Sequence, residues 1–559
     1  MLFSPPNRER RSNKNVWVER WGKRSTLISL VLVFAACCSV MLTLRDYGVT
    51  WDEPRYFAAG SSYLQWLSSP SLSTINQYWL INLQHPPLTK VLGGITNAIF
   101  NEHLHWFDEY VAYRISLLPF IITLTLTFFS FAKAYLGVWP AAYVSLALMF
   151  HPSLFFHAHI SAMDYAITAM WFVTAYALWK SEDSFRWIVL ASVALGLSLL
   201  TKINGFSLYG IVAMVLLMRL IRELRRGDMA KQLAPVKAML VRAGILIIIP
   251  ILIFCACWPW LWRSPAYRTW SYLHFFDSHH LIPTYYFGTQ YLDLAPPWHL
   301  PPVLIVLATP ILIVLLFLIG LFSTAFPTKA RIFILANFVL ALGVISFSRS
   351  KHDGIRLFLP AIPFLYLTAG AGLVTTYSYF GKRVQGWKQA RHFPLIFSAL
   401  VIVLLGMTIG HSTVRYHPYQ TAYFNEMVGG DRGAVAYGLE YEYWCGSYIE
   451  ALKWMDQHSE STFWVPICAH LFAYYHSTGL INNELKIAGQ GAGSQYLVLP
   501  SRLGFFDSIL WKYFKNETPV FSVRAYQENV LNIYSLRAAD AASAGPINNQ
   551  SSVKNDPGR

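Results

Sequence analysis

The chain carries a series of apolar segments, and each is long enough to cross a membrane. A spanning helix needs about 20 apolar residues because the hydrocarbon core is roughly 30 Å thick, and about eleven stretches meet this requirement. A mean hydropathy of +0.38 is too high for an ordinary soluble surface. The sequence therefore predicts a mainly α-helical, polytopic membrane protein. The stretches cover residues 26–43, 111–133, 139–157, 162–180, 186–202, 206–221, 240–258, 301–322, 330–347, 356–377 and 394–411.

The basic residues predict how the helices are oriented. Lys and Arg gather in short segments that alternate along the chain, beginning with the N-terminus, and cytoplasmic loops carry such an excess. The net charge of +15 therefore indicates how the helices are oriented in the membrane, and we expect no nucleic-acid partner. The basic start is followed by an apolar run with no small-residue cleavage site, so we expect the first helix to be retained as an anchor.

The same pattern divides the chain into four regions. Residues 412–540 lose the long apolar runs and predict a small soluble α/β domain on the outer side, while the polar tail predicts disorder. The first outer loop, residues 44–110, is amphipathic, and its tryptophans are expected at headgroup depth. Those tryptophans are Trp51, Trp66, Trp79 and Trp106. The regions are a cytoplasmic start (1–25), a transmembrane region (26–411), an extracytoplasmic domain (412–540) and a tail (541–559).

Of the six cysteines, only Cys445 and Cys468 lie outside apolar runs. On an outer domain they could form a disulfide, and two unpaired structural thiols fit the sequence equally well. The cysteine spacing matches no metal site.

Carboxylates at the membrane edge are the strongest functional signal. Asp52 and Glu53 follow the first apolar run, and Asp164 opens a later one on the same predicted side. A charge at the edge of an apolar helix is costly unless it is paired or used. Asp52 alone could be a helix cap or a solvated acid, whereas Asp164 is harder to explain in that way.

Basic side chains that suit a phosphate are predicted on the same side. Taken singly, each residue is typical of a side chain that extends its charge to the membrane interface. Taken together, beside three acids, they predict a site where an anionic group binds next to a proton acceptor. They are Arg55, His85, Lys90, Lys202, Arg263, Arg268, Lys351, His352 and Arg356.

A sugar attached to a polyprenyl phosphate would use all of these features. Its lipid needs a groove at bilayer depth, its phosphate needs cations, and the acceptor hydroxyl needs a carboxylate base. We expect Asp52 to accept that proton. Aromatic residues of the outer loops could stack on the sugar or could simply belong to the interface; they are Trp51, Trp258, Trp260, Tyr285 and Tyr286.

Five motifs resemble GT-C membrane glycosyltransferases, in the branch of protein O-mannosyltransferases and the lipid A aminoarabinose transferase. They are WDEPRYFAAG (51–60), QHPPLTKVL (84–92), SAMDYAITAMWF (161–172), LTKINGF (200–206) and RLFLPAIPFLYL (356–367). The resemblance runs in order from residue 26 to about residue 377. It implies a GT-C fold and an inverting glycosyltransferase in a bacterial inner membrane, with the site and the C-terminal domain on the periplasmic side.

The resemblance also implies roles for individual residues. Catalytic roles fall to Asp52, Glu53 and Asp164, and binding of the donor phosphate or substrate falls to Arg55, Tyr56, His85, Lys202, His352 and Arg356. The donor is a polyprenyl-phosphate sugar, and the acceptor is a hydroxyl of a protein, a lipid such as lipid A or a glycan.

A metal in this site is an open question. The aminoarabinose enzyme has a glutamate before its Lys-Pro-Pro motif that contributes to metal binding, and this chain has Gln84 before His85. A divalent cation such as Mg²⁺, Mn²⁺ or Zn²⁺ is therefore doubtful, although His85 beside Asp52 could form a different site. The segment after residue 415 resembles a bacterial subset of these enzymes, and it predicts a scaffolding or acceptor-binding domain more readily than a second catalytic site.

Two other classes of protein remain possible from the sequence. A transporter or flippase of lipid-linked sugars would also need many spans, although its charges usually lie near the membrane midplane. A zinc hydrolase could use the histidines of the loop 259–300, but no HExxH motif occurs. The residues concerned are His274, Asp277, His279, His280 and His299.

Overall fold

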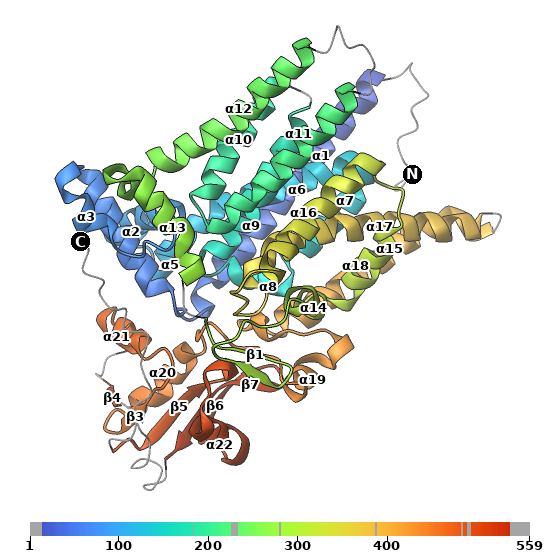
Figure 1. Cartoon of the computed structure of the whole chain (residues 1–559). Helices are drawn as coiled ribbons and strands as arrows, with labels where there is room; N and C mark the ends of the chain where they lie inside the picture. Colours follow the sequence, from blue (N-terminus) through green and yellow to red (C-terminus); the bar gives the residue numbers. More distant parts are fainter. Residues whose placement is uncertain are drawn as a thin grey trace.

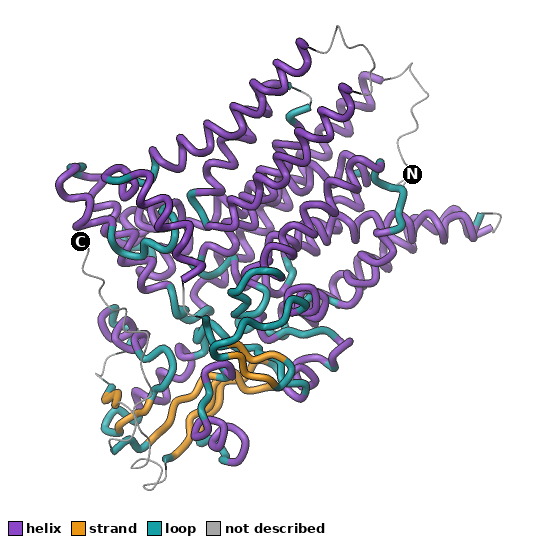
Figure 2. The backbone as a smooth tube through the Cα atoms, in the orientation of Figure 1, coloured by secondary structure: helices purple, strands orange, loops and turns teal. Residues whose placement is uncertain are grey.

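The chain folds into a large helical bundle with a small α/β unit at one end (Figure 1, Figure 2). The computed structural model describes residues 14–182, 184–224, 233–278, 281–385, 388–481, 485–488 and 493–536. The predicted mainly helical membrane protein with a small C-terminal α/β region is confirmed. The tail 541–559 and most of the basic start lie outside the described residues.

Each predicted apolar range contains helix, but not every range is one straight span. The helices of the bundle are α1 (Lys14–Thr43), α2 (Glu53–Ser68), α3 (Ile75–Trp79), α4 (Leu88–Asn97), α5 (Glu109–Arg114), α6 (Leu118–Leu136), α7 (Val138–Met149), α8 (Pro152–His157), α9 (Met163–Lys180), α10 (Phe185–Leu199), α11 (Leu208–Leu224), α12 (Leu233–Ala256), α13 (Pro265–Ser278), α14 (Leu300–Leu307), α15 (Ile311–Leu321), α16 (Thr328–Ser346), α17 (Ile362–Val384) and α18 (Phe393–Ile409).

The predicted count of eleven crossings is not reproduced. Within the described residues, seven helices are long and apolar enough to span, and the pair α14 and α15, bent by 118°, makes an eighth if it is one crossing. The range 139–157 breaks between α7 and α8, where Pro152 starts the second helix. Pro310 lies at the bend between α14 and α15. Proline lacks the amide hydrogen and clashes with the preceding turn, so it divides apolar runs that look continuous in the sequence.

Helix α17 is the centre of the bundle. In its most apolar stretch 94% of the residues are buried, against 17% for both α12 and α18. Gly320 of α15 lies against Thr368, and Gly372 of α17 lies against Leu316, so closely that an added Cβ would sit 1.9 Å from the facing carbonyl oxygen in both cases. Small residues allow helix backbones to approach in this way within a membrane.

The loops 44–110 and 259–300 form an aromatic layer beside the bundle. Trp66 and Trp79 of the first loop are buried in one cluster with Trp258 and Trp260. Trp66 and Trp79 are therefore packed against the other loop, and their depth in the membrane stays a prediction. Trp106 is 62% exposed.

The C-terminal unit is built on a five-stranded mixed sheet in the order β4-β3-β5-β7-β6. Strand β3 pairs in parallel with β4 and β5, whereas β7 pairs antiparallel with β5 and β6. Cys445 and Cys468 form a disulfide, which decides between the two possibilities left by the sequence. The elements are α19 (Gly430–Ala436), α20 (Tyr448–Gln457), β3 (Thr462–Trp464), α21 (His470–Ser477), β4 (Lys486–Ala488), β5 (Tyr496–Pro500), α22 (Ser508–Asn516), β6 (Phe521–Ala525) and β7 (Glu528–Ser535). A separate hairpin, β1 (Thr284–Tyr286) with β2 (Thr289–Tyr291), comes from the loop after α13.

We expect Gly372→Ala to lower stability by about 1–3 kcal/mol, because the new methyl group forces α15 and α17 apart. Gly343→Ala in α16 is the matched control, since no atom lies within 4 Å of its added Cβ. Thermal unfolding of both variants in detergent checks this. Equal melting temperatures for the two variants would contradict the close helix contact.

Candidate functional site

The predicted acids lie at the end of the bundle that faces the C-terminal unit, but their surroundings differ. The Asp52 side chain is 32% exposed, that of Asp164 is 3% exposed and that of Glu53 is fully covered. Asp52 immediately precedes α2, and its side chain makes no capping hydrogen bond. Asp52 thus occupies the cap position of α2 without using its side chain as a cap, and this carboxylate is the accessible one of the three.

Arg356 joins the charged groups of the site. One guanidinium nitrogen lies 3.4 Å from Asp52 Oδ2, and the other lies 2.7 Å from Asp353 Oδ2 and 3.2 Å from His352 Nε2. The guanidinium stacks over the Trp444 ring, 4.6 Å from its centroid. Arg356 opens the buried start of the α17 segment, so its position is fixed by the bundle core.

Asp353 connects the bundle to the C-terminal unit. Its second oxygen accepts a hydrogen bond from Arg502 Nη2 at 2.9 Å. Burial would raise the pKa of Asp353, but Arg356 and Arg502 outweigh it and hold that pKa below its usual value. Burial lowers the pKa of His352 to about 3, so this histidine is neutral and cannot supply the positive charge that the sequence predicted for it.

The segment around Trp444 forms one wall of the site. The Trp444 carbonyl accepts a hydrogen bond from the Trp51 amide at 3.0 Å, and its indole nitrogen donates to His157 Nε2 at 3.3 Å. Trp444 and Tyr443 share an apolar cluster with Tyr56. The C-terminal unit therefore contributes side chains to the site itself.

Asp164 is paired with Lys202. Lys202 Nζ lies 2.5 Å from Asp164 Oδ1, and both side chains are buried. Asp164 begins α9, and Lys202 belongs to the Thr-Lys turn after α10, so the ion pair fastens two of the predicted motifs together. Asp164 is close enough to Arg356, and Lys202 to Asp353, to contribute to the electrostatic field at these groups.

Glu53 faces away from the accessible part of the site. Its two oxygens bind Arg114 at 2.8 and 2.7 Å, and they also accept hydrogen bonds from Ser161 N and from both Thr50 N and Thr50 Oγ1. A carboxylate with every acceptor position occupied and no exposure has no room for a substrate. The geometry therefore favours a structural role for Glu53 over the catalytic role that the resemblance implied.

A second group of predicted residues lies beside the start of α2. The Tyr56 side chain lies near Asp52, and the Tyr56 ring meets His85 edge to face at 6.0 Å between centroids. Arg55 is exposed. Burial, together with the nearby Arg55, holds the pKa of Lys90 well below its usual value. Lys90 Nζ donates to the Asn82 and His85 carbonyl oxygens, so it shapes the loop that carries His85.

The remaining predicted cations have other partners. Arg268 donates to Asn76 and to the Trp260 carbonyl, and Lys351 donates to the Ser348 carbonyl. Arg263 lies beside Trp260 in the aromatic layer and is exposed. Of the proposed zinc ligands, His274 bonds the Trp270 carbonyl and His299 contacts Tyr286. His279, His280 and the Asp277 side chain lie outside the described residues.

The acids of the site do not fit a divalent cation. Asp52, Asp164 and Asp353 each face a basic side chain that already balances their charge. In the described part of the chain, no group of three or more His, Cys, Asp or Glu residues is arranged to hold a metal ion. We therefore derive no step that uses a metal.

The predicted motifs overlap a segment that matches a known family. Residues 75–261 match the family described as dolichyl-phosphate-mannose-protein mannosyltransferase. The predicted resemblance is confirmed. This segment includes QHPPLTKVL, SAMDYAITAMWF and LTKINGF, and so contains Asp164 and Lys202. No curated protein sequence matches the chain.

Among solved structures, the chain is similar to ArnT from Cupriavidus metallidurans. The apo form has a TM-score of 0.48 at 14% identity, and the form bound to undecaprenyl phosphate has a TM-score of 0.46 at 13% identity; both comparisons cover 95% of this chain and 100% of that one. The apo oligosaccharyltransferase from Archaeoglobus fulgidus has a TM-score of 0.42 at 12% identity, over 87% of this chain and 70% of that one.

Sequence reasoning missed four residues of the site. Arg114 carried a signal, because a charge beside an apolar run requires a partner, and Glu53 is that partner. Asp353 lies between two residues that the sequence did single out, His352 and Arg356. Trp444 and Arg502 gave no signal, since their approach to the site depends on how the C-terminal unit docks.

Glu53→Gln should lower stability by about 3–5 kcal/mol, because it leaves the buried Arg114 charge without its counter-ion. Glu460→Gln is the control, since Glu460 forms an ion pair whose side chains are 97% and 55% exposed, and we expect no measurable change there. Thermal unfolding of the two variants tests this. A Glu53→Gln variant that unfolds like the native protein but has lost turnover would restore the catalytic interpretation.

Proposed function

We propose that this protein is an inverting glycosyltransferase that moves a sugar from a polyprenyl-phosphate donor to a hydroxyl acceptor. The observation that carries the proposal is the environment of Asp52. This accessible carboxylate is paired with Arg356, lies near Tyr56, and is followed three residues later by Arg55, which is exposed. The match of residues 75–261 to mannosyltransferases that use dolichyl phosphate mannose supports the same chemistry.

The proposed reaction is a single displacement. Asp52 takes the proton of the acceptor hydroxyl while the acceptor oxygen forms a bond to the anomeric carbon. The bond between that carbon and the phosphate oxygen breaks, and its electron pair leaves with the polyprenyl phosphate. Attack opposite to the leaving group inverts the anomeric centre. Because a phosphate leaves readily, cations that stabilise it take the place of a strong general acid.

Arg55 and His85 are the residues that we assign to the donor phosphate. Arg55 follows Asp52 by three residues, so base and phosphate site are both set by the start of α2. His85 is attached to the same surface through its contact with Tyr56. Arg356 is already bound to two carboxylates, and we assign it to orienting Asp52.

Asp164 and Lys202 are assigned to positioning. Their buried ion pair holds the Asp164 carboxylate within electrostatic range of Arg356 and ties α9 to the turn after α10. His352, which is neutral, would hold the Arg356 guanidinium through its ring nitrogen and would not act as a phosphate cation. Tyr56 would orient Asp52 through its hydroxyl.

The C-terminal unit is the natural place for the acceptor to approach, because Trp444 and Arg502 bring it against Asp52 and Arg356. We propose that this face lies outside a bacterial inner membrane, as the basic loops predicted. Hexose and pentose donors, and protein, lipid A and glycan acceptors, are all compatible with these residues.

Asp52→Asn should reduce turnover by about 10²–10⁴-fold, because the amide cannot accept the acceptor proton. Asp108→Asn is the control, since Asp108 is an exposed acid of the same loop that pairs with Arg45. Mass spectrometry of the purified protein in native-like lipid should show polyprenyl-phosphate sugar enriched in Asp52→Asn, which also names the sugar. Full turnover by this variant would remove the proposed base. Lack of donor in both proteins, with the fold intact, would favour the transporter instead.

Arg55→Gln should weaken donor binding by about 10-fold or more, because it removes a charged hydrogen bond to the phosphate. Arg45→Gln removes an exposed positive charge elsewhere in the first loop and serves as the control. Titration with a short-chain polyprenyl-phosphate sugar measures the two affinities. An unchanged donor affinity in Arg55→Gln would rule out its contact with the phosphate.

A further inference from the structure

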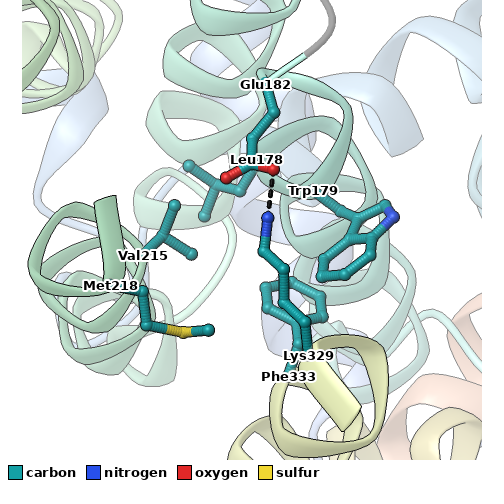
Figure 3. A pocket seen from close by; sticks show the side chains of 7 residues that line it. All are labelled: Leu178, Trp179, Glu182, Val215, Met218, Lys329 and Phe333. Atoms are coloured by element: carbon teal, nitrogen blue, oxygen red, sulfur yellow. Dashed lines mark hydrogen bonds and ion pairs between the residues drawn. The ribbon is translucent and has the colours of Figure 1, made fainter. Parts of the chain in front are cut away.

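A second charged cluster lies at the opposite end of α9 from the candidate site. Helix α9 has 18 residues, and at 1.5 Å per residue its ends lie about 27 Å apart. Just beyond its last residue, Glu182 contacts Lys329 of α16 and lies 3.6 Å from Arg219 and 3.5 Å from Arg222 of α11. Figure 3 shows Glu182 and Lys329 meeting over a crevice between these helices. The cluster has no part in the proposed transfer reaction.

Among the described residues, the cluster has more positive than negative charge. One carboxylate, Glu182, faces three basic side chains, and Arg242 of α12 adds to the positive field at Arg219. Arg219 is only 4% exposed, yet its Nε and Nη1 atoms have no hydrogen-bond partner within the described residues. Its third nitrogen donates to Ser181 Oγ. Buried guanidinium nitrogens without partners are costly, so a further anion would stabilise this arrangement.

The surroundings of the cluster suit a lipid. The crevice is lined by apolar side chains: Leu178, Trp179, Val215, Met218 and Phe333 (Figure 3). On the surface of the same two helices, the side chains of Leu217, Ile221 and Ile332 are 55%, 40% and 48% exposed. Lys329 and Arg222 are partly exposed at the ends of their helices, where apolar side chains give way to charged ones. Phospholipid headgroups meet spanning helices where apolar side chains give way to charged ones in this way.

We propose that this cluster is a binding site for an anionic glycerophospholipid. The lipid phosphate would lie between Arg222 and Lys329, in the positive field of Arg219 and Arg242. One acyl chain would follow the apolar surface of α11 and α16. Basic pockets between spanning helices on the cytoplasmic side of a membrane bind anionic headgroups through this combination of charge and apolar contact.

Native mass spectrometry of the full-length protein tests the proposal with two lipids of identical acyl chains, phosphatidylglycerol and phosphatidylcholine. The double variant Arg222→Gln/Lys329→Gln should bind phosphatidylglycerol about 10- to 30-fold more weakly, at roughly 1 kcal/mol for each basic residue lost. The control Lys382→Gln/Arg383→Gln removes two cations from the end of α17 and should bind like the native protein. Equal binding of both lipids by the native protein, or equal loss in the control, would overturn the proposal.

Two further measurements distinguish a bound lipid from a purely structural ion-pair cluster and from free phosphate. Glu182→Gln should strengthen phosphatidylglycerol binding, because it removes the carboxylate that competes with the phosphate. If the cluster were only a structural clamp, this variant would lose thermal stability and gain no lipid binding. Millimolar inorganic phosphate should not displace the lipid, and complete displacement would identify free phosphate as the ligand and overturn the lipid proposal.

Discussion

The carboxylate of Asp353, held between two buried guanidinium groups, is the contact on which the site depends. Arg356 reaches it from the central helix segment and Arg502 reaches it from the C-terminal unit. In a region of low dielectric none of these charges is tolerable alone, so the two parts of the chain are stabilised only when docked. Docking in turn brings Trp444 over Arg356 and leaves Asp52 as the accessible acid.

Buried ion pairs also fix the other walls of the site. Arg114 binds Glu53 and the carbonyl oxygens of Leu44, Tyr47 and Gly48, so one guanidinium holds the chain between α1 and α2 in place. Lys202 and Asp164 do the same for the turn after α10. The catalytic geometry that we propose therefore rests on charges that never meet the substrate. Their function is to hold the start of α2 and the turn after α10 in place.

Helix α9 relates the two ends of the molecule. Its first turn carries Asp164 and its last turn leads to Glu182, so both charged clusters are fixed to one buried helix. The first cluster has paired charges and an accessible acid, which suits chemistry on a bound substrate. The second, in the described residues, has surplus positive charge next to exposed apolar side chains, which suits the anionic headgroup that we propose. The same helix is therefore linked to two clusters of different electrostatic character.

Much of this could be read from the sequence, because hydrophobicity and charge act locally. The apolar ranges predicted the helices, and the carboxylates at their edges predicted where Asp52, Asp164 and Lys202 would gather. The predictions that failed concerned contacts between residues far apart in the sequence. The sequence could not show that Pro152 and Pro310 each divide an apolar run into two helices. It also could not show that the Glu53 carboxylate is fully hydrogen-bonded to Arg114, Thr50 and Ser161. It could not place Trp79 inside an aromatic layer, because the covering residues come from another loop.

The sequence by itself thus determined a membrane protein with its acids at one end. Only the tertiary structure decided which acid is accessible, because accessibility depends on how Arg356, Arg502 and Trp444, far apart in the chain, pack around it.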